Sequence, residues 1–233
     1  TLNSVLVGKG FQPIRTLESS ALGDIQIAGV YRYYDRDKVK LAMKAFGQLP
    51  TGKKDDPNDL VDIPTGGQPA VGLASIHEFF VIPKVSLTTS LTYQLNISDT
   101  SLMRVPSGPD DLLPGPDRLE EVQRHTGNSF TAEAGGRYLA TGSLEFGLFY
   151  DFIAKDPDSY DGMHADWNYG FLSQNTNNTM HTLKASVNFS TVNSYLAKEF
   201  AIPFQVEYMF AATLYALNFP NQTTHQLALR MFF

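Results

Sequence analysis

The chain has 233 residues, a formal net charge of −6 at pH 7 and no cysteine. The charge argues against a nucleic-acid partner, which needs a basic face, and the lack of cysteine excludes a disulfide framework and thiolate chemistry. Only 18% of the residues are charged, below the roughly one quarter that is usual in soluble domains, and the length suits a single β domain spanning residues 1–233.

Most of the chain alternates apolar with polar residues, which is the period of a β-strand that has two different faces. In chain order, strands are expected at residues 2–8, where the pattern is weak, and at residues 24–34, 38–48, 70–82, 85–97, 128–139, 142–153, 181–191, 204–214 and 226–233. The stretch 85–97 alternates most clearly and is long enough to cross a bilayer as a tilted strand, which takes about 9 to 11 residues. Residues 116–124, which begin with a proline followed by acidic residues, are expected to form one or two helical turns inside a loop.

The connections between these strands alternate in length, apart from the last hairpin. Those at 35–37, 83–84, 140–141 and 218–223 are short, those at 49–69, 98–127 and 154–180 are long, and 192–202 is intermediate. Short periplasmic turns and long extracellular loops are typical of outer-membrane barrels, and lipid offers no partner to an open sheet edge. The sequence therefore predicts an all-β fold, a closed antiparallel up-and-down transmembrane β-barrel of about ten strands, or of twelve if N-terminal residues are missing or a strand lies in a loop.

No run of about 18 apolar residues occurs, so a transmembrane helix is not expected. No signal peptide is visible at Thr1. An exported protein would have lost it, or the sequence begins inside the gene.

The end of the chain carries apolar residues at every second position and finishes on phenylalanine. These residues are Leu227, Leu229, Met231 and Phe233. The pattern resembles the C-terminal signal of bacterial outer-membrane barrels, in which the last strand closes the sheet and aromatic residues lie at the membrane interface. The alternative is an ordinary amphipathic edge strand.

Two loop segments and one strand entry resemble a known family. Residues 47–53 (GQLPTGK) and 55–67 (DDPNDLVDIPTGG) resemble the "LPTG…D…PTG" loop of the outer-membrane proteins grouped as the phenol meta-pathway degradation-like family. Leu22-Gly23-Asp24 is similar to that family's "GxGD" strand entry, with Ala21 in place of the first glycine. The resemblance implies a barrel related to transporters of hydrophobic compounds, and it implies a location more firmly than a substrate.

Alternation separates the charged residues of the strands from the apolar ones, and the charged side chains are expected to face an enclosed lumen. They are Arg32, Lys38, Lys40, Lys44, Glu133, Arg137, Glu145, Asp151, Lys184, Glu207 and Arg230. In a narrow barrel, charges of both signs could pair across the bore and fill it, or they could line a polar path that selects solutes. The sequence leaves both interpretations open.

The loops contain two further groups of candidate residues. Asp55, Asp56, Asp59 and Asp62 could bind Ca²⁺, which prefers oxygen ligands, although their spacing is not that of an EF-hand and a solvated loop tip is the alternative. Tyr160, Trp167, Tyr169 and Phe171 could form an apolar docking patch, or could pack within the loops and the outer aromatic girdle.

Motifs of catalysis are lacking in the sequence. The five histidines are scattered, and neither the His-Glu-x-x-His pair of zinc hydrolases nor a Gly-x-Ser-x-Gly elbow occurs. His225 is expected on the apolar side of the last strand, at headgroup level. An enzyme is therefore not expected, and a membrane-embedded hydrolase is the disfavoured alternative.

These patterns predict a protein of the outer membrane of a Gram-negative bacterium, without a cofactor apart from loosely bound Ca²⁺. The first hypothesis is a channel or transporter for small, including hydrophobic, solutes. The second is a non-transporting scaffold that anchors an envelope protein, and a soluble ligand-binding barrel is disfavoured because the strands lack polar outer faces. Expected partners are the lipid bilayer, lipopolysaccharide and the barrel-assembly machinery during insertion.

Overall fold

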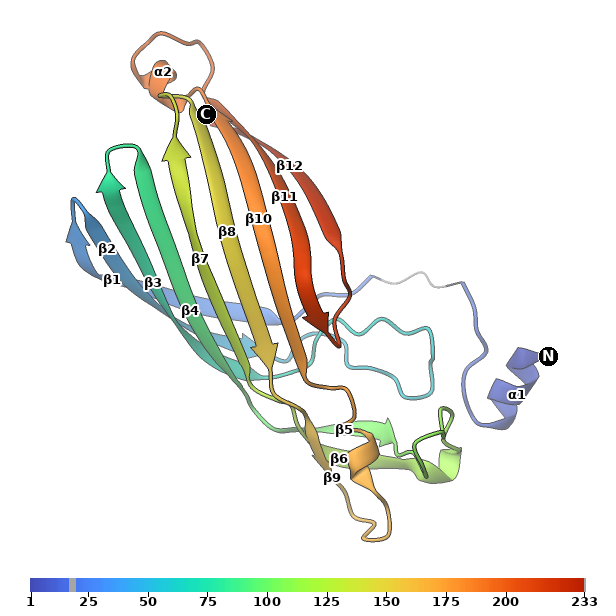
Figure 1. The fold of residues 1–233 in the computed structure, drawn as a ribbon. Coiled ribbons are helices and arrows are strands. Elements are labelled where there is room, and N and C mark those ends of the chain that lie inside the picture. Colours follow the sequence, from blue (N-terminus) through green and yellow to red (C-terminus); the bar gives the residue numbers. More distant parts are fainter. Residues whose placement is uncertain (17–19, 233) are drawn as a thin grey trace.

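The computed structural model describes residues 1–16 and 20–232, and its main feature is one antiparallel sheet of nine strands (Figure 1). Each strand pairs with the next large strand along the chain, so the sheet is an up-and-down meander. The strands in sheet order are β1 (Ile25–Arg36), β2 (Val39–Leu49), β3 (Ala70–Ile82), β4 (Val85–Asn96), β7 (Ser129–Leu139), β8 (Leu144–Lys155), β10 (Asn178–Ser190), β11 (Phe204–Leu217) and β12 (Thr223–Met231). The all-β, antiparallel, up-and-down prediction is confirmed.

The two ends of the sheet differ in their connections. At the turn end, residues 37–38, 83–84 and 140–143 join neighbouring strands, and a longer segment carries helix α2 (Val192–Leu196). At the loop end, the long connections form a second sheet of three short strands, β5 (Asp99–Arg104), β6 (Leu119–His125) and β9 (Ser159–Asp161). Figure 1 shows α2 and this small sheet at opposite ends of the large sheet.

The small sheet belongs to a larger unit that we call the loop cap. It consists of residues 1–15, 50–69, 97–128 and 156–177, and includes helix α1 (Leu2–Gly8) and the 3₁₀ turns η1 (Pro116–Arg118) and η2 (Tyr169–Phe171). The largest fully buried side chains of the described residues, Leu6, Val105 and Val122, all lie in it. The large sheet, by contrast, is a single layer, and among the described residues no second layer packs on either of its faces.

Two predicted elements were wrong. Residues 2–8 form helix α1 instead of a strand, because the Thr1 hydroxyl accepts the amide of Ser4 as an N-cap and Leu2, Val5 and Leu6 recur at helical spacing, with Leu6 buried. In the stretch 116–124, only η1 is helical, and the chain then enters β6. Among the described residues, no helix has the length and apolarity needed to cross a membrane.

In the described residues the large sheet is open between β1 and β12, so the predicted closure into a barrel is not confirmed. Every residue of β1 is exposed, as are nearly all residues of β12. Because nine strands alternate in direction, β1 and β12 run the same way. A ladder joining these two edges directly would therefore be parallel, unlike the antiparallel ladders in the rest of the sheet.

Candidate functional site

The pairing registers place almost all predicted lumen residues on one face of the large sheet, the polar face. Ser90 of β4 lies opposite Glu133, Glu133 lies opposite Asp151, and Asn188 lies opposite both Glu145 and Glu207. Residues directly opposite in a ladder share a face. By these registers, the polar face carries Arg32, Lys40, Lys44, Glu133, Arg137, Glu145, Asp151, Lys184, Glu207 and Arg230.

One predicted lumen residue falls elsewhere. Lys38 lies in the turn between β1 and β2. A register shift between Arg32 and Tyr34 puts Tyr34 opposite Leu41, on the other face from Arg32. The extra residue of a β-bulge reverses the alternation beyond it, and strict alternation across residues 32–34 could not reveal this.

Ion pairs connect the charges on the β7–β12 half of the polar face. Lys184 contacts Asp151, and its Nζ lies 3.5 Å from Glu133 Oε2 on β7, two strands away. The remaining pairs are Arg230–Glu207 at 3.0 Å and Arg137–Glu145 at 3.8 Å.

A cavity of about 140 Å³ on this half is lined by Glu133, Arg137, Phe149, Lys184, Ser186, Glu207 and Met209. Asp151 Oδ1 is buried and has no hydrogen-bond partner in the described part of the chain.

Aromatic rings also lie on the polar face, each beneath a cation. Lys44 Nζ is 5.3 Å from the centre of the Phe46 ring, and Lys40 Nζ is 4.9 Å from that of Phe80. Arg137 lies over Phe149 at 5.3 Å. These distances fall within the roughly 6 Å range of cation–π attraction, so the polar face combines charge with apolar surface.

Glycines on neighbouring strands make room for two of these rings. Gly72 lies opposite Phe46, and Gly135 lies opposite Phe149. A Cβ at either glycine would overlap the facing ring. These rings were not predicted from the sequence, although glycine inside a strand signals the close approach of another group.

The opposite face of the large sheet, the apolar face, is exposed and rich in large hydrophobic residues. Leu87, Leu91 and Leu148 lie on it and are 43%, 46% and 57% exposed. On β12, Leu227 and Leu229 are 74% and 65% exposed, and Met231 is exposed as well, while Phe233 lies outside the described residues. A soluble protein rarely leaves so large an apolar surface uncovered.

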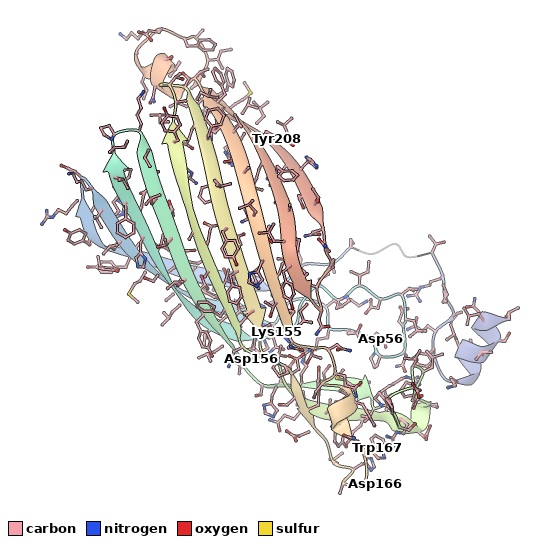
Figure 2. The ribbon with its side chains drawn as sticks, viewed as in Figure 1. Asp56, Lys155, Asp156, Asp166, Trp167 and Tyr208 are labelled. Carbon is pink, nitrogen blue, oxygen red and sulfur yellow. The ribbon has the colours of Figure 1, made fainter. Side chains whose placement is uncertain are left out.

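Histidines on the apolar face are hydrogen-bonded to hydroxyl groups and packed among aromatic rings. His181 contacts the Tyr150 hydroxyl and lies edge-on to Phe152, with ring centres 5.1 Å apart. His225 Nδ1 lies 2.7 Å from the hydroxyl of Tyr208, which Figure 2 labels on the large sheet. No catalytic triad of serine, histidine and carboxylate forms around His181 or His225 among the described contacts.

Buried charges hold the loop cap together. Arg104 donates to the carbonyl oxygens of Lys9 at 3.0 Å, Gly10 at 2.8 Å and Pro114 at 2.7 Å, and its Nη2 lies 2.6 Å from Asn58 Oδ1. Its guanidinium also stacks on Phe11 at 3.9 Å. One side chain thus connects the N-terminal segment with two of the long loops.

Three of the four predicted aromatic loop residues, Tyr160, Trp167 and Tyr169, take part in packing within the loop cap. Trp167, labelled in Figure 2, stacks on the ring of His164 with ring centres 4.1 Å apart. The central guanidinium carbon of Arg118 lies 4.0 Å from the centre of the Trp167 ring. The Tyr169 hydroxyl donates to Glu120 Oε2 at 2.6 Å. Burial raises the pKa of Tyr160 to about 12, with the Asp158 carboxylate as the next cause. The docking-patch alternative is therefore not favoured at these residues.

The motif residues 47–67 wrap around the carboxylate of Asp24. Its Oδ1 accepts the amides of Gly52 at 2.7 Å and Gly67 at 2.8 Å, and its Oδ2 accepts Gln48 Nε2 at 2.9 Å. Gly67 has φ +91°, and a Cβ at Gly66, where φ is +146°, would overlap Asp24. Burial raises the pKa of Asp24, but the hydrogen bonds from Gly67, Gly52 and Gln68 outweigh it, so the pKa lies below its ordinary value. The motif is thus a structural clasp at the loop end.

The four candidate aspartates of this loop are not arranged as a metal site. Asp59 pairs with Arg15 at 2.7 Å, Asp62 pairs with Lys53, and Asp56 accepts Gln12 Nε2 at 3.0 Å. Burial raises the pKa of Asp55, with Asp62 and Asp56 as further causes. In residues 1–16 and 20–232, no group of three or more His, Asp or Glu side chains is placed to hold a metal ion, and the structure gives the Ca²⁺ prediction no support.

Comparison with solved structures finds a similar fold. An outer membrane channel from Pseudomonas putida F1 superposes with a TM-score of 0.59 at 14% sequence identity, and the match covers 91% of this chain and 65% of the channel's chain. The chain therefore spans about two thirds of the length of that channel. No model of a protein family and no curated protein sequence matches the chain.

Proposed function

We propose that the chain forms the wall of a channel for small solutes, hydrophobic ones included, in the outer membrane of a bacterium. The observation that carries this proposal is the two-faced single-layer sheet, with exposed apolar residues on one face and paired charges on the other. Lipid would cover the first face, and an aqueous lumen would hydrate the second. The similarity in fold to a solved outer membrane channel supports the same reading.

In this proposal the turn end lies in the periplasm and the loop cap lies outside the cell, near lipopolysaccharide. Short periplasmic turns and long outer loops are the usual arrangement of such proteins. The exposed residues Leu227, Leu229 and Met231 of β12 would face lipid and serve the barrel-assembly machinery as a terminal signal.

Closure of the sheet is part of the proposal, because the bilayer leaves an open edge unpaired. Since β1 and β12 run the same way, closure takes either a parallel β1–β12 seam or an odd number of further strands between them. A disulfide between cysteines placed on facing positions of β1 and β12 would support the direct seam. Its consistent absence would support intervening strands.

The direct test is the current through planar bilayers that contain the purified protein. Step-like currents are expected, and Lys184→Met should shift the reversal potential in a salt gradient toward cation selectivity, because Asp151 and Glu133 lose their cation. Leu183→Met, on the apolar face of the same strand, is the matched control and should leave the potential unchanged. Folded, inserted protein without any current would contradict a channel.

A non-transporting scaffold is the second candidate, and the ion pairs favour it. Lys184, Arg137 and Arg230 each have a carboxylate partner on the polar face, and such pairs could fill a narrow bore. Liposomes that contain the protein would then not swell in any small solute, whereas a channel admits solutes below its bore size.

A further inference from the structure

The connection between β10 and β11 differs from its neighbours at the turn end. Residues 191–203, which we call the α2 segment, lie where other strand pairs are joined by residues 37–38, 83–84 or 140–143. Figure 1 shows this segment extending beyond the strand ends. A hairpin needs only a few residues, so most of the α2 segment is not required to connect β10 with β11.

Hydrogen bonds fix the base of the α2 segment. The buried Thr191 hydroxyl donates to Ile202 O at 2.7 Å and accepts the amide of Phe204 at 3.0 Å, and the Thr191 amide donates to Phe204 O at 2.9 Å. Phe232 N, near the end of the chain, donates to Pro203 O at 3.0 Å. Within the segment, the amides of Glu199 and Phe200 bond to Ser194 O. The segment therefore has a defined conformation.

Apolar side chains of the α2 segment are exposed and continue the apolar face. Leu196 is 72% exposed, Phe200 is 46% exposed and Ile202 is 50% exposed. The Phe200 ring packs on Phe204 at 6.0 Å between ring centres, and Phe204 lies equally close to Phe189. Phe189 lies opposite Val206 and Phe204 opposite Met231, so both belong to the apolar face. Phe200 extends that face past the last strand residues.

The polar residues of the segment suit a membrane surface. Helix α2 ends at Leu196, and Lys198 follows with φ +62°. The segment carries one positive residue, Lys198, and one negative residue, Glu199, so its formal net charge is zero. Both residues are exposed. A lysine near apolar residues can keep its charge at headgroup level while its stem covers apolar surface. Apolar residues beside balanced charges, at the rim of a lipid-facing sheet, match the polarity gradient of an interfacial membrane element.

We propose that the α2 segment binds the phospholipid surface of the periplasmic leaflet and inserts Leu196, Phe200 and Ile202 at the boundary between headgroups and acyl chains. The inference rests on the proposed function, because it requires the sheet to cross that membrane. The segment would fix the height of β10 and β11 in the bilayer, as interfacial residues do in other membrane proteins. The occupant is lipid and not a periplasmic protein, because the exposed apolar residues are continuous with the proposed lipid-facing surface.

Fluorescence quenching by brominated lipid tests this proposal. The natural tryptophan is removed by Trp167→Phe, and a reporter is introduced by Leu196→Trp or, as a second variant, Phe200→Trp, in phosphatidylcholine vesicles. Glu199→Trp is the control at an exposed charged position of the segment, and Leu148→Trp reports on the sheet. At an insertion depth of ~5–10 Å, lipid brominated near the headgroup should remove about half of the emission of both reporters. Glu199→Trp should instead be quenched by aqueous acrylamide.

The controls separate the possible failures. If Leu148→Trp is quenched by lipid but neither segment reporter is, the sheet lies in the membrane and the α2 proposal is wrong. If Leu148→Trp is also unquenched, the proposed function itself fails. Segment reporters that become shielded from acrylamide only when a periplasmic extract is added would identify a protein partner and overturn the assignment to lipid.

Discussion

At the scale of single residues, Asp24 explains why the loop motif has its particular glycines. Asp24→Ala removes the acceptor of the Gly52 and Gly67 amides, and the loss of hydrogen bonds to a charged group costs ~1–3 kcal/mol. Tryptic cleavage after Lys53 and Lys54, both in this loop, should then accelerate about tenfold or more, since 1.4 kcal/mol is tenfold. Cleavage at the wild-type rate would contradict the clasp.

The same contact predicts a dependence on pH. Because the pKa of Asp24 is lowered on folding, its stabilisation is fully present above the ordinary value of 3.8 and is lost as the pH falls through the lower, folded value. The amide signals of Gly52 and Gly67 in NMR spectra should therefore shift on acidification with a midpoint below 3.8. A midpoint above that value would show that the carboxylate is not held in this way.

Glycine on the polar face gives a second residue-scale prediction. Gly72→Ala should destabilise the protein by ~1–3 kcal/mol, because the new methyl group overlaps the Phe46 ring. Gly47→Ala in the adjacent strand is the matched control, since a Cβ there meets nothing within 4 Å. Urea unfolding in detergent micelles compares the two, and equal stability of both variants would show that the ring does not occupy this place.

At the scale of elements, the sequence predicted strands well and the loop cap poorly. Alternation located the nine large strands because one face is apolar over many consecutive pairs. It failed at residues 2–8, where the helix depends on burying Leu6, and at β5, β6 and β9, which are stabilised by contacts with distant parts of the chain. The position of Phe46 on the polar face was also predictable only from its cross-strand glycine.

Arg104 is the element-scale test of the loop cap. Arg104→Met keeps the aliphatic stem but leaves the buried carbonyl of Pro114 and the part-buried carbonyls of Lys9 and Gly10 without this donor. Each buried unsatisfied group costs ~1–3 kcal/mol. Hydrogen exchange at the amides of Val105 and Val122 should accelerate at least about a hundredfold, as expected for ~3 kcal/mol.

The matched control for this substitution is Arg15→Met. The Arg15 side chain is half exposed in its pair with Asp59, and exposed ion pairs contribute only ~0–1 kcal/mol. Arg15→Met should therefore change hydrogen exchange at the amides of Val105 and Val122 only slightly. If Arg104→Met has no larger effect than this control, the loop cap does not depend on Arg104.

At the scale of the whole molecule, the alternating faces were predictable and the open edge was not. The two-residue repeat of apolar side chains assigns each strand residue to a face, but it does not predict which strand pairs with the outer edge of β1 or of β12. The direction of β1 relative to β12 appears only once the strands are counted in the structure. The way in which the sheet closes must therefore be determined by experiment, because the sequence pattern does not predict it.

The proposed function depends most on which face of the sheet meets lipid, and this can be tested with single cysteines because the chain contains no cysteine. Single cysteines at Leu183, Lys184, Ala185, Ser186, Val187 and Asn188 of β10 would be spin-labelled in reconstituted vesicles. Labels at 184, 186 and 188 should be accessible to a water-soluble paramagnetic reagent, and labels at 183, 185 and 187 to oxygen dissolved in the lipid. Uniform accessibility along β10, or the reverse alternation, would contradict a membrane-spanning sheet.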